Sequence, residues 1–172
     1  MPDDHEAKPT IRQMIEKDAE KRPNMKDVFP NKKLLYNKID GQKENELHRA
    51  AKRGSIDTVN YLLKLEVAVD TKNNLRRTAL LLAARNGRLA VVQSLLEKKA
   101  YVGTTDKHGS TPLHYAAEHG YVDIVMELLN AGADPEVVNK NKVTALDLAK
   151  AHHRVNVVKV LEESNSMYSV YM

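Results

Sequence analysis

The chain has 172 residues with no cysteine and no tryptophan, and 27 lysines and arginines against 23 aspartates and glutamates give a net charge of +4. Without a thiol there can be no disulfide, cysteine-ligated zinc, iron–sulfur cluster or cysteine nucleophile. The longest apolar run, Ala79 to Ala84, is six residues, far short of the roughly 20 that span a bilayer. The first residues lack the basic start and apolar core of a signal peptide. We therefore expect no membrane insertion and an intracellular protein, cytoplasmic, nuclear or both.

Two helices are predicted in the first 39 residues. Thr10 can cap a helix from Ile11 to about Lys21, which Pro23 ends, and a second short helix can begin at Asn31. These helices either dock as a cap on the repeats that follow or form a detachable amphipathic segment that binds a partner.

From residue 40 onward the sequence repeats itself every 33 residues, beginning with Leu47, Leu80, Leu113 and Leu146. Other residues keep the same register: the alanine pairs Ala50-Ala51, Ala83-Ala84 and Ala116-Ala117, the glycines Gly54, Gly87 and Gly120, and the leucine pairs Leu62-Leu63, Leu95-Leu96 and Leu128-Leu129. We predict four copies, at about 40–72, 73–105, 106–138 and 139–164. The remaining residues, 165–172, are expected to form a frayed tail, or else a strand that adds to a groove capturing a free C-terminus.

The third copy predicts a pair of helices. Thr111 followed by Pro112 is typical of a helix start, and Gly120 can end that helix in a left-handed conformation. A second helix is predicted from Val122 to Asn130, with Gly132 after it. Its apolar stripe is expected to consist of Val122, Val125, Leu128 and Leu129. The capping slot of Thr111 is filled by Asn45, Thr78 and Thr144 in the other copies.

Departures from the repeat pattern are informative at the ends of the stack. In the last copy Lys150 replaces an alanine and Glu162 replaces a leucine, which predicts a charged outer face that closes the stack.

Glu66 and Lys99 occupy the slot of Gly132, and each should cost its helix end roughly 1 kcal/mol or less.

The third copy reads D-K-H-G-S-T-P-L-H-Y-A-A-E-H-G-Y-V-D-I-V-M-E-L-L-N-A-G-A-D from Asp106 to Asp134. Its T-P-L-H-x-A-A-x-x-G core, the paired leucines and the final G-A-D resemble the ankyrin repeat. The resemblance covers about 125 residues. It implies an all-α solenoid of helix-turn-helix units with hairpin-like loops, to which the N-terminal helices are added. It also implies that His48 and His114, in the T-P-L-H slot, form hydrogen bonds between adjacent loops.

Nothing in the sequence supports an enzyme. It lacks a phosphate-binding loop, a G-x-S-x-G or H-E-x-x-H motif and a paired-carboxylate constellation. We therefore expect no catalytic residue, no metal and no cofactor.

By resemblance, the chain recognises another protein through a concave surface, which consists of the loop tips and the first helix of each copy. The exposed slots of that surface hold Arg49, Lys52, Arg53, Asn74, Arg76, Arg77, Arg85, Asn86, Lys107, His108, Ser110, Tyr115, Glu118, His119, Lys140 and Asn141. Leu82 falls in another such slot. Basic residues far outnumber acidic ones in this set.

Such a surface favours an acidic or phosphorylated segment of a partner protein, with Arg77 and Arg85 suited to bidentate contacts and Tyr115 as a central anchor. The alternative is a solvated basic surface without a special partner. Direct nucleic-acid binding is disfavoured, because Tyr115 is the one aromatic ring among these slots and stacking would be scarce. The protein is then an adaptor or scaffold, or a small autonomous inhibitor that sterically blocks an enzyme or assembly factor, or a bacterial effector with a eukaryote-like repeat.

Overall fold

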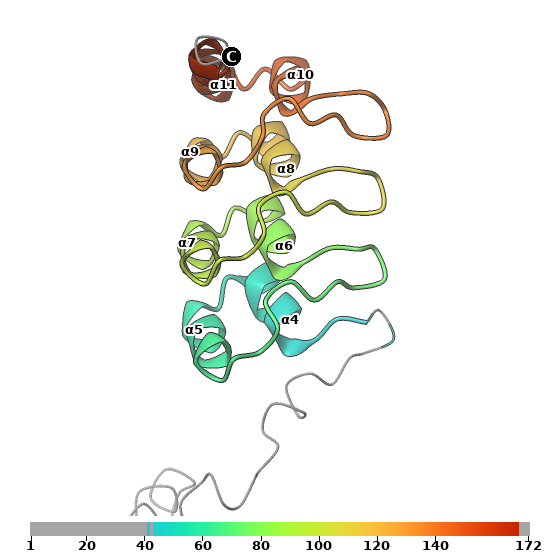
Figure 1. Ribbon diagram of the computed structural model, residues 1–172, viewed down its shortest axis with the longest axis vertical. Coiled ribbons are helices and arrows are strands. Elements are labelled where there is room, and N and C mark those ends of the chain that lie inside the picture. Colours follow the sequence, from blue (N-terminus) through green and yellow to red (C-terminus); the bar gives the residue numbers. More distant parts are fainter. Residues whose placement is uncertain (1–40, 42, 169–172) are drawn as a thin grey trace, which may run out of the picture. The chain divides into compact units, whose positions relative to one another are not determined.

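The computed structural model describes residues 41 and 43–168, so the predicted N-terminal helices and the last four residues lie outside the described residues. Within the described part there are eight helices and no strand (Figure 1). The helices are α4 (Glu46–Arg53), α5 (Ile56–Lys64), α6 (Ala79–Arg85), α7 (Leu89–Glu97), α8 (Pro112–His119), α9 (Val122–Asn130), α10 (Ala145–Ala151) and α11 (Val155–Tyr168).

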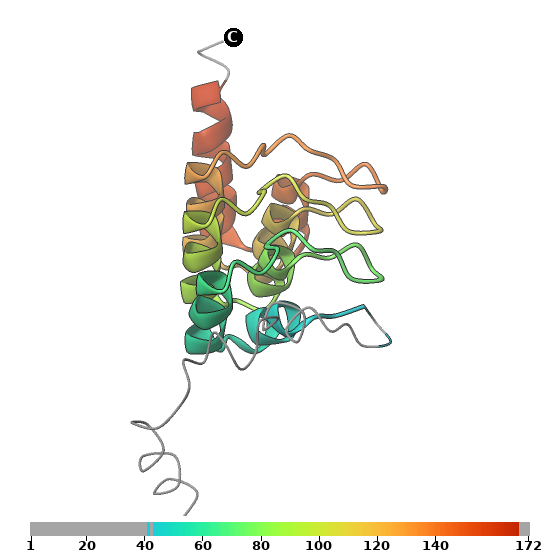
Figure 2. The ribbon, with the colours of Figure 1, turned by 60° about the horizontal axis from the view of Figure 1, so that its bottom comes forward.

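The eight helices form two layers. Helices α4, α6, α8 and α10 follow one another in an inner layer, and α5, α7, α9 and α11 follow in an outer layer (Figure 1). Loops between successive pairs project from the inner layer as a row of hairpin-shaped tips (Figures 1 and 2). This is the predicted all-α solenoid of helix pairs.

The core of the solenoid is shared between neighbouring repeats. Leu47, Leu80 and Leu113 are at most 1 % exposed, and the alanine pairs that follow them in the inner helices are fully buried or nearly so. Small alanine side chains let one inner helix approach the next, so each leucine is enclosed by two repeats. Full burial of one such leucine contributes about 1.5–3 kcal/mol. Aliphatic residues in a fixed register can therefore build this core without tryptophan.

Each inner helix begins at the predicted cap. The Thr111 hydroxyl accepts a hydrogen bond from the backbone N–H of His114 at 3.3 Å, and Asn45 accepts one from His48 at 3.0 Å. Thr78 and Thr144 accept in the same way from Leu81 and Asp147. These bonds satisfy amides that would otherwise have no partner in the first turn.

Two details of the outer layer differ from the prediction. Helix α9 has the predicted bounds, but Ile124 is buried beside Val125 and Leu128 although the predicted apolar stripe left it out. Helix α11 continues to Tyr168, so residues 165–168 of the expected frayed tail are helical.

The last repeat presents charge on its outer face, as the substitutions in its sequence predict. Lys150 Nζ lies 2.9 Å from Glu162 Oε1, and both side chains are 53 % exposed. The two residues that replace an alanine and a leucine of the other copies thus pair with each other at the surface.

Residues spaced by 33 also join the repeats at the turns between their two helices. Arg88 Nε donates to the Lys52 carbonyl at 3.3 Å, and Arg154 Nε donates to the Glu118 carbonyl at 3.0 Å. Tyr121 takes the equivalent place between them, and its ring lies against Gly87. The arginines therefore satisfy carbonyls at the ends of inner helices in the preceding repeat.

Glycine-to-alanine substitutions should separate two roles of glycine: adopting a left-handed backbone, and leaving room for a neighbouring side chain. Gly87 (φ +69°) and Gly132 (φ +86°) both have left-handed backbones, but an added Cβ at Gly87 would lie 2.8 Å from the Tyr121 ring, whereas one at Gly132 meets nothing within 4 Å. Gly132→Ala should cost about 1 kcal/mol from the backbone alone. Gly87→Ala should cost more, because the ring must also move. Urea unfolding of both variants measures the difference, and equal losses would contradict the proposed contact.

Candidate functional site

In each of three loop tips, one side chain forms hydrogen bonds with the backbone of its own turn. Asp106 Oδ1 accepts hydrogen bonds from the backbone N–H groups of His108 (2.8 Å) and Ser110 (3.1 Å), and its own N–H donates to the Ser110 carbonyl (3.1 Å). Asn73 and Asn139 make the equivalent bonds in the neighbouring tips. A short side chain that bonds to the backbone two and four residues ahead fixes a tight turn.

Buried histidines connect the inner helices to the tips, as the resemblance implies. His48 Nε2 donates to the carbonyls of Thr71 (2.9 Å) and Arg77 (3.1 Å), and His114 Nε2 donates to that of Val143 (3.1 Å). Burial lowers the pKa of both imidazoles below the ordinary value. Each histidine thereby holds the next repeat's tip in place.

Other residues take the histidine slot in the second and fourth repeats. Leu81 is buried there without a polar group. Asp147 accepts from the backbone N–H (2.9 Å) and the hydroxyl (2.8 Å) of Thr144, and these bonds lower the pKa of its carboxyl group.

The structure exposes nine of the sixteen predicted surface residues and encloses the rest to differing degrees. The exposed ones are Lys52, Arg53, Asn74, Arg76, Lys107, His108, His119, Lys140 and Asn141. The half-buried ones are Arg49, Arg77, Arg85, Asn86, Tyr115 and Glu118. Ser110 is buried, and so is Leu82. The expectation of exposure was wrong for these last two: Ser110 closes the tip on Asp106, and Leu82 is 3 % exposed within α6.

Arg77 is not the free ligand-binding cation that the sequence suggested. Its side chain is 16 % exposed, and Nε lies 3.8 Å from Oδ2 of Asp106, whose side chain is fully buried. This pair joins the second repeat to the third. Arg77 therefore neutralises a buried carboxylate within the fold.

Asp106 also holds Tyr115, and Tyr115 lies beneath Arg85. The Tyr115 hydroxyl donates to Asp106 Oδ2 at 2.7 Å, and the Arg85 guanidinium carbon lies 5.2 Å from the centre of the tyrosine ring. Burial, followed by the bond to Asp106, raises the pKa of Tyr115. Tyr115 thus supports Arg85 by a cation–π contact.

Sequence reasoning missed the central role of Asp106. The signal was present, because Asp106 is the acidic member of a register position that holds Asn73 and Asn139 in neighbouring copies. An acid at that position adds a charge to a turn that an amide can form equally well.

The end of α8 carries a second group of polar side chains. His119 donates from Nδ1 to the Tyr115 carbonyl at 2.9 Å, and its ring stacks on Tyr121 with a centroid distance of 5.7 Å. Glu118 Oε1 lies 3.8 Å from His152 Nε2 of the next repeat. The acidic side chain on this part of the concave surface therefore already has a basic neighbour.

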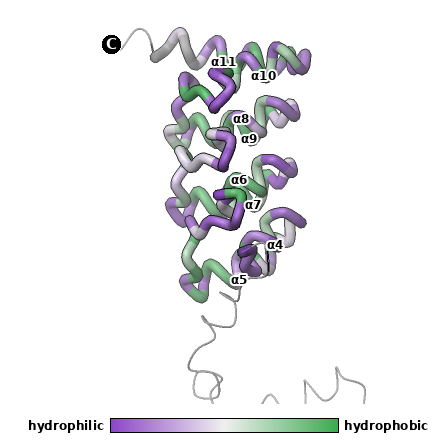
Figure 3. Tube along the Cα trace, turned by 90° about the vertical axis from the view of Figure 1, so that its right-hand side faces the viewer, coloured by the Kyte–Doolittle hydropathy of each residue, from purple (hydrophilic) through white to green (hydrophobic). Residues whose placement is uncertain are grey.

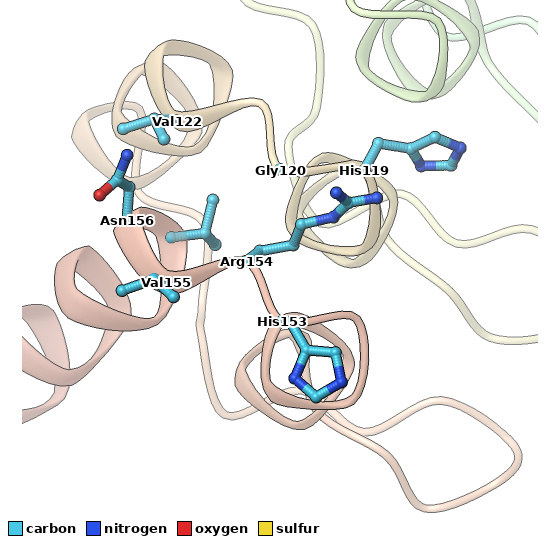
Figure 4. Close-up of a pocket in the computed structure, with 8 residues that line it drawn as sticks. His119, Gly120, Val122, His153, Arg154, Val155 and Asn156 are labelled. Atoms are coloured by element: carbon cyan, nitrogen blue, oxygen red, sulfur yellow. The ribbon is translucent and has the colours of Figure 1, made fainter.

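A cleft of about 310 Å³ lies between the third and fourth repeats, lined by residues around Gly120 and the start of α11 (Figure 4). The Arg154 side chain extends past Gly120, and the His119 ring points away from the cleft (Figure 4). A similar cleft lies one repeat earlier, around Gly87 and Tyr121. The recurrence shows that these clefts arise from the stacking of helix pairs.

The described residues offer neither a metal site nor a membrane span. No group of three or more histidines, aspartates or glutamates there could hold a metal ion. None of the helices in that part of the chain combines the length and the apolar character needed to span a bilayer.

The family described as "Ankyrin repeats (3 copies)" matches residues 10–106 and 99–169. The chain belongs to the ankyrin repeat family. Ankyrin repeats are generally protein–protein interaction modules and are typically non-enzymatic. The match begins within the first 39 residues, which the 33-residue register did not include. No curated protein matches the sequence.

The ankyrin histidines should make stability depend on pH. Because burial lowers the folded-state pKa of His114 below the ordinary value of 6.5, the folded protein binds fewer protons than the unfolded chain, and the free energy of unfolding should fall as the pH drops below about 6.5. His114→Leu, which copies Leu81, should lose about 1 kcal/mol near pH 7.5 with its hydrogen bonds. Its stability should then fall less steeply toward pH 5.5. Urea unfolding across this range tests the slope, and parallel pH curves would contradict the assignment.

Asp106→Asn should shift the titration of Tyr115. An asparagine can keep the turn, as it does at Asn73 and Asn139, but it removes the negative charge beside the phenol. The raised pKa of Tyr115 should therefore fall toward the ordinary tyrosine value of about 10. NMR of ring-labelled tyrosine measures it. Asp123→Asn, an exposed site on α9, is the control and should leave Tyr115 unchanged.

Proposed function

We propose that this ankyrin protein is a non-enzymatic adaptor or scaffold inside the cell, in the cytoplasm, the nucleus or both. In this proposal it binds an acidic or phosphorylated segment of a partner protein through its concave surface. The observation that carries the proposal is the imbalance between available cations and available acids on that surface.

Some cations of the concave surface are engaged within the fold, since Arg49 and Arg53 lie beside Glu46, whereas others are not. Asp106 is enclosed by Arg77 and Tyr115, and Glu118 lies beside His152. By contrast, Lys107 is exposed, and no described residue forms an ion pair with it. A partner's carboxylate or phosphate can therefore meet a cation on this surface without displacing a strong internal pair.

Arg85 is the best-positioned cation for such a contact. The Tyr115 ring supports its guanidinium from one side, and no described residue forms a hydrogen bond or ion pair with it. A guanidinium held on an aromatic face keeps its N–H groups available at the edge, where carboxylate and phosphate oxygens can accept two parallel bonds. Arg77 cannot act in this way, because Asp106 already engages it.

Charge reversal on the concave surface should abolish partner capture. In a pull-down from cell extract, Arg85→Glu with Lys107→Glu should lose the proteins that the wild type retains, because two attractive sites become repulsive. The matched control is Lys64→Glu with Lys98→Glu, which makes the same charge change at exposed positions on α5 and just after α7. Thermal melts must show that both variants fold. Equal retention by both would refute binding through this surface.

A further inference from the structure

The loop tips of the second, third and fourth repeats form a row of cations. Each of these tips carries at least one exposed basic side chain, and together they make up what we call the basic edge: Arg76, Lys107, Lys140 and Lys142. The tips project on one side of the inner layer (Figure 1), and viewed from that side they are mostly hydrophilic (Figure 3).

No exposed acid interrupts this row. Among residues 73–77, 106–110 and 139–143 the one acidic residue is Asp106, whose side chain is fully buried and bonded to its own turn and to Tyr115. No described residue forms an ion pair with a member of the basic edge. Its positive charge therefore faces solvent without local neutralisation.

Two of the cations occupy costly backbone positions. Arg76 and Lys142 both have φ of 59°, in the register position that Gly109 fills in the third repeat with φ of 75°. Glycine adopts this left-handed conformation freely, whereas a residue with a Cβ is strained there. Lys43 holds the same register position in the first repeat with φ of 55°, so three of the four tips place a basic side chain where glycine would also fit.

The backbone holds the tips at a fixed spacing. Lys107 N–H donates to the Leu75 carbonyl at 3.0 Å, and Lys140 N–H donates to the His108 carbonyl at 2.9 Å. These bonds tie the second tip to the third and the third to the fourth. The edge therefore offers a ligand its basic side chains at a fixed spacing.

The spacing determines which ligand fits. Packed helices lie about 8–10 Å apart, and an extended chain advances about 3.3 Å per residue, so successive tips correspond to about three residues. We propose that the basic edge binds an extended acidic segment of a partner protein, with a carboxylate about every third residue, running along the stack. This inference rests on the proposed function and assigns its partner segment to the tips. A nucleic acid fits less well, because His108 is the one ring at these tips and Arg85 covers Tyr115.

Fluorescence anisotropy with synthetic peptides tests the proposal. One labelled peptide of about 12 residues, long enough at about 3.3 Å per residue to pass three tips, has glutamate at every third position in a Gly/Ser background. A second has the same composition with its glutamates consecutive, and a single-stranded DNA of equal charge is the third probe. The wild type should bind the spaced peptide most tightly. Equal affinity for the two peptides, or tighter binding of the DNA, would overturn the proposal.

Two variants assign the binding to the edge. Arg76→Glu with Lys107→Glu and Lys140→Glu should weaken the spaced peptide about tenfold or more, whereas the outer-helix control Lys64→Glu with Lys98→Glu and Lys159→Glu should weaken it much less. Arg76→Gly with Lys142→Gly, which copies Gly109, should weaken binding without lowering the melting temperature, because it removes charge and relieves backbone strain. Equal weakening by edge and control variants would overturn the proposal.

The pull-down separates this inference from the proposed function. If charge reversal at Arg85 and Lys107 abolishes partner capture but the edge variants leave peptide binding unchanged, the concave surface binds a partner and the acidic segment does not lie on the tips. If that charge reversal leaves partner capture unchanged, the proposed function itself fails.

Discussion

The close approach of one inner helix to the next is the constraint on which the rest of this structure depends. No helix pair can bury its own apolar face, so each repeat relies on its neighbour for its core. The buried alanine pairs of the first three inner helices make that approach possible. Everything on the concave surface follows from it, because the spacing of the inner helices sets the spacing of the tips.

The part of the fold that depends on periodic residues could be predicted from the sequence. The slots of Asn45, Thr78, Thr111 and Thr144 gave correct helix starts because a cap acts through its own backbone within three residues. Gly54 and Gly120 end the inner helices α4 and α8, as their slot predicts, for a similar local reason. The slot of Gly132, after the outer helices, holds other residues in two copies. Glu66 and Lys99 adopt left-handed backbones with φ of 55° and 62°, which shows that the register fixes the conformation even without glycine.

The surface was harder to predict, because exposure depends on contacts between repeats. Arg77, Ser110 and Leu82 hold slots that the ankyrin pattern exposes, yet in this chain Arg77 is half-buried and the other two are buried. Arg77 stands at the register position of Glu44 and Ser110, which are buried, and it lies beside Asp106, where the adjacent copies have asparagine. Glu44 and Asn73 make the equivalent contact one repeat earlier through a hydrogen bond of 3.0 Å, so this register position faces the next repeat, and no pattern within a single repeat contains that information. The length of α11 was missed for another reason, since no further copy follows to mark its end.

The second and third repeats are joined differently from the other two pairs. Arginines bond to carbonyls of the preceding inner helix at the first and last junctions, whereas the middle junction has Tyr121 at that place. The Arg77–Asp106 pair replaces the Glu44–Asn73 hydrogen bond of the first junction, and the Arg85–Tyr115 contact is added. A ligand that draws Arg85 away from the Tyr115 ring breaks one of the contacts between these two repeats. Binding of such a ligand and the stability of this junction are therefore thermodynamically linked, so that binding weakens the junction and a weakened junction favours binding.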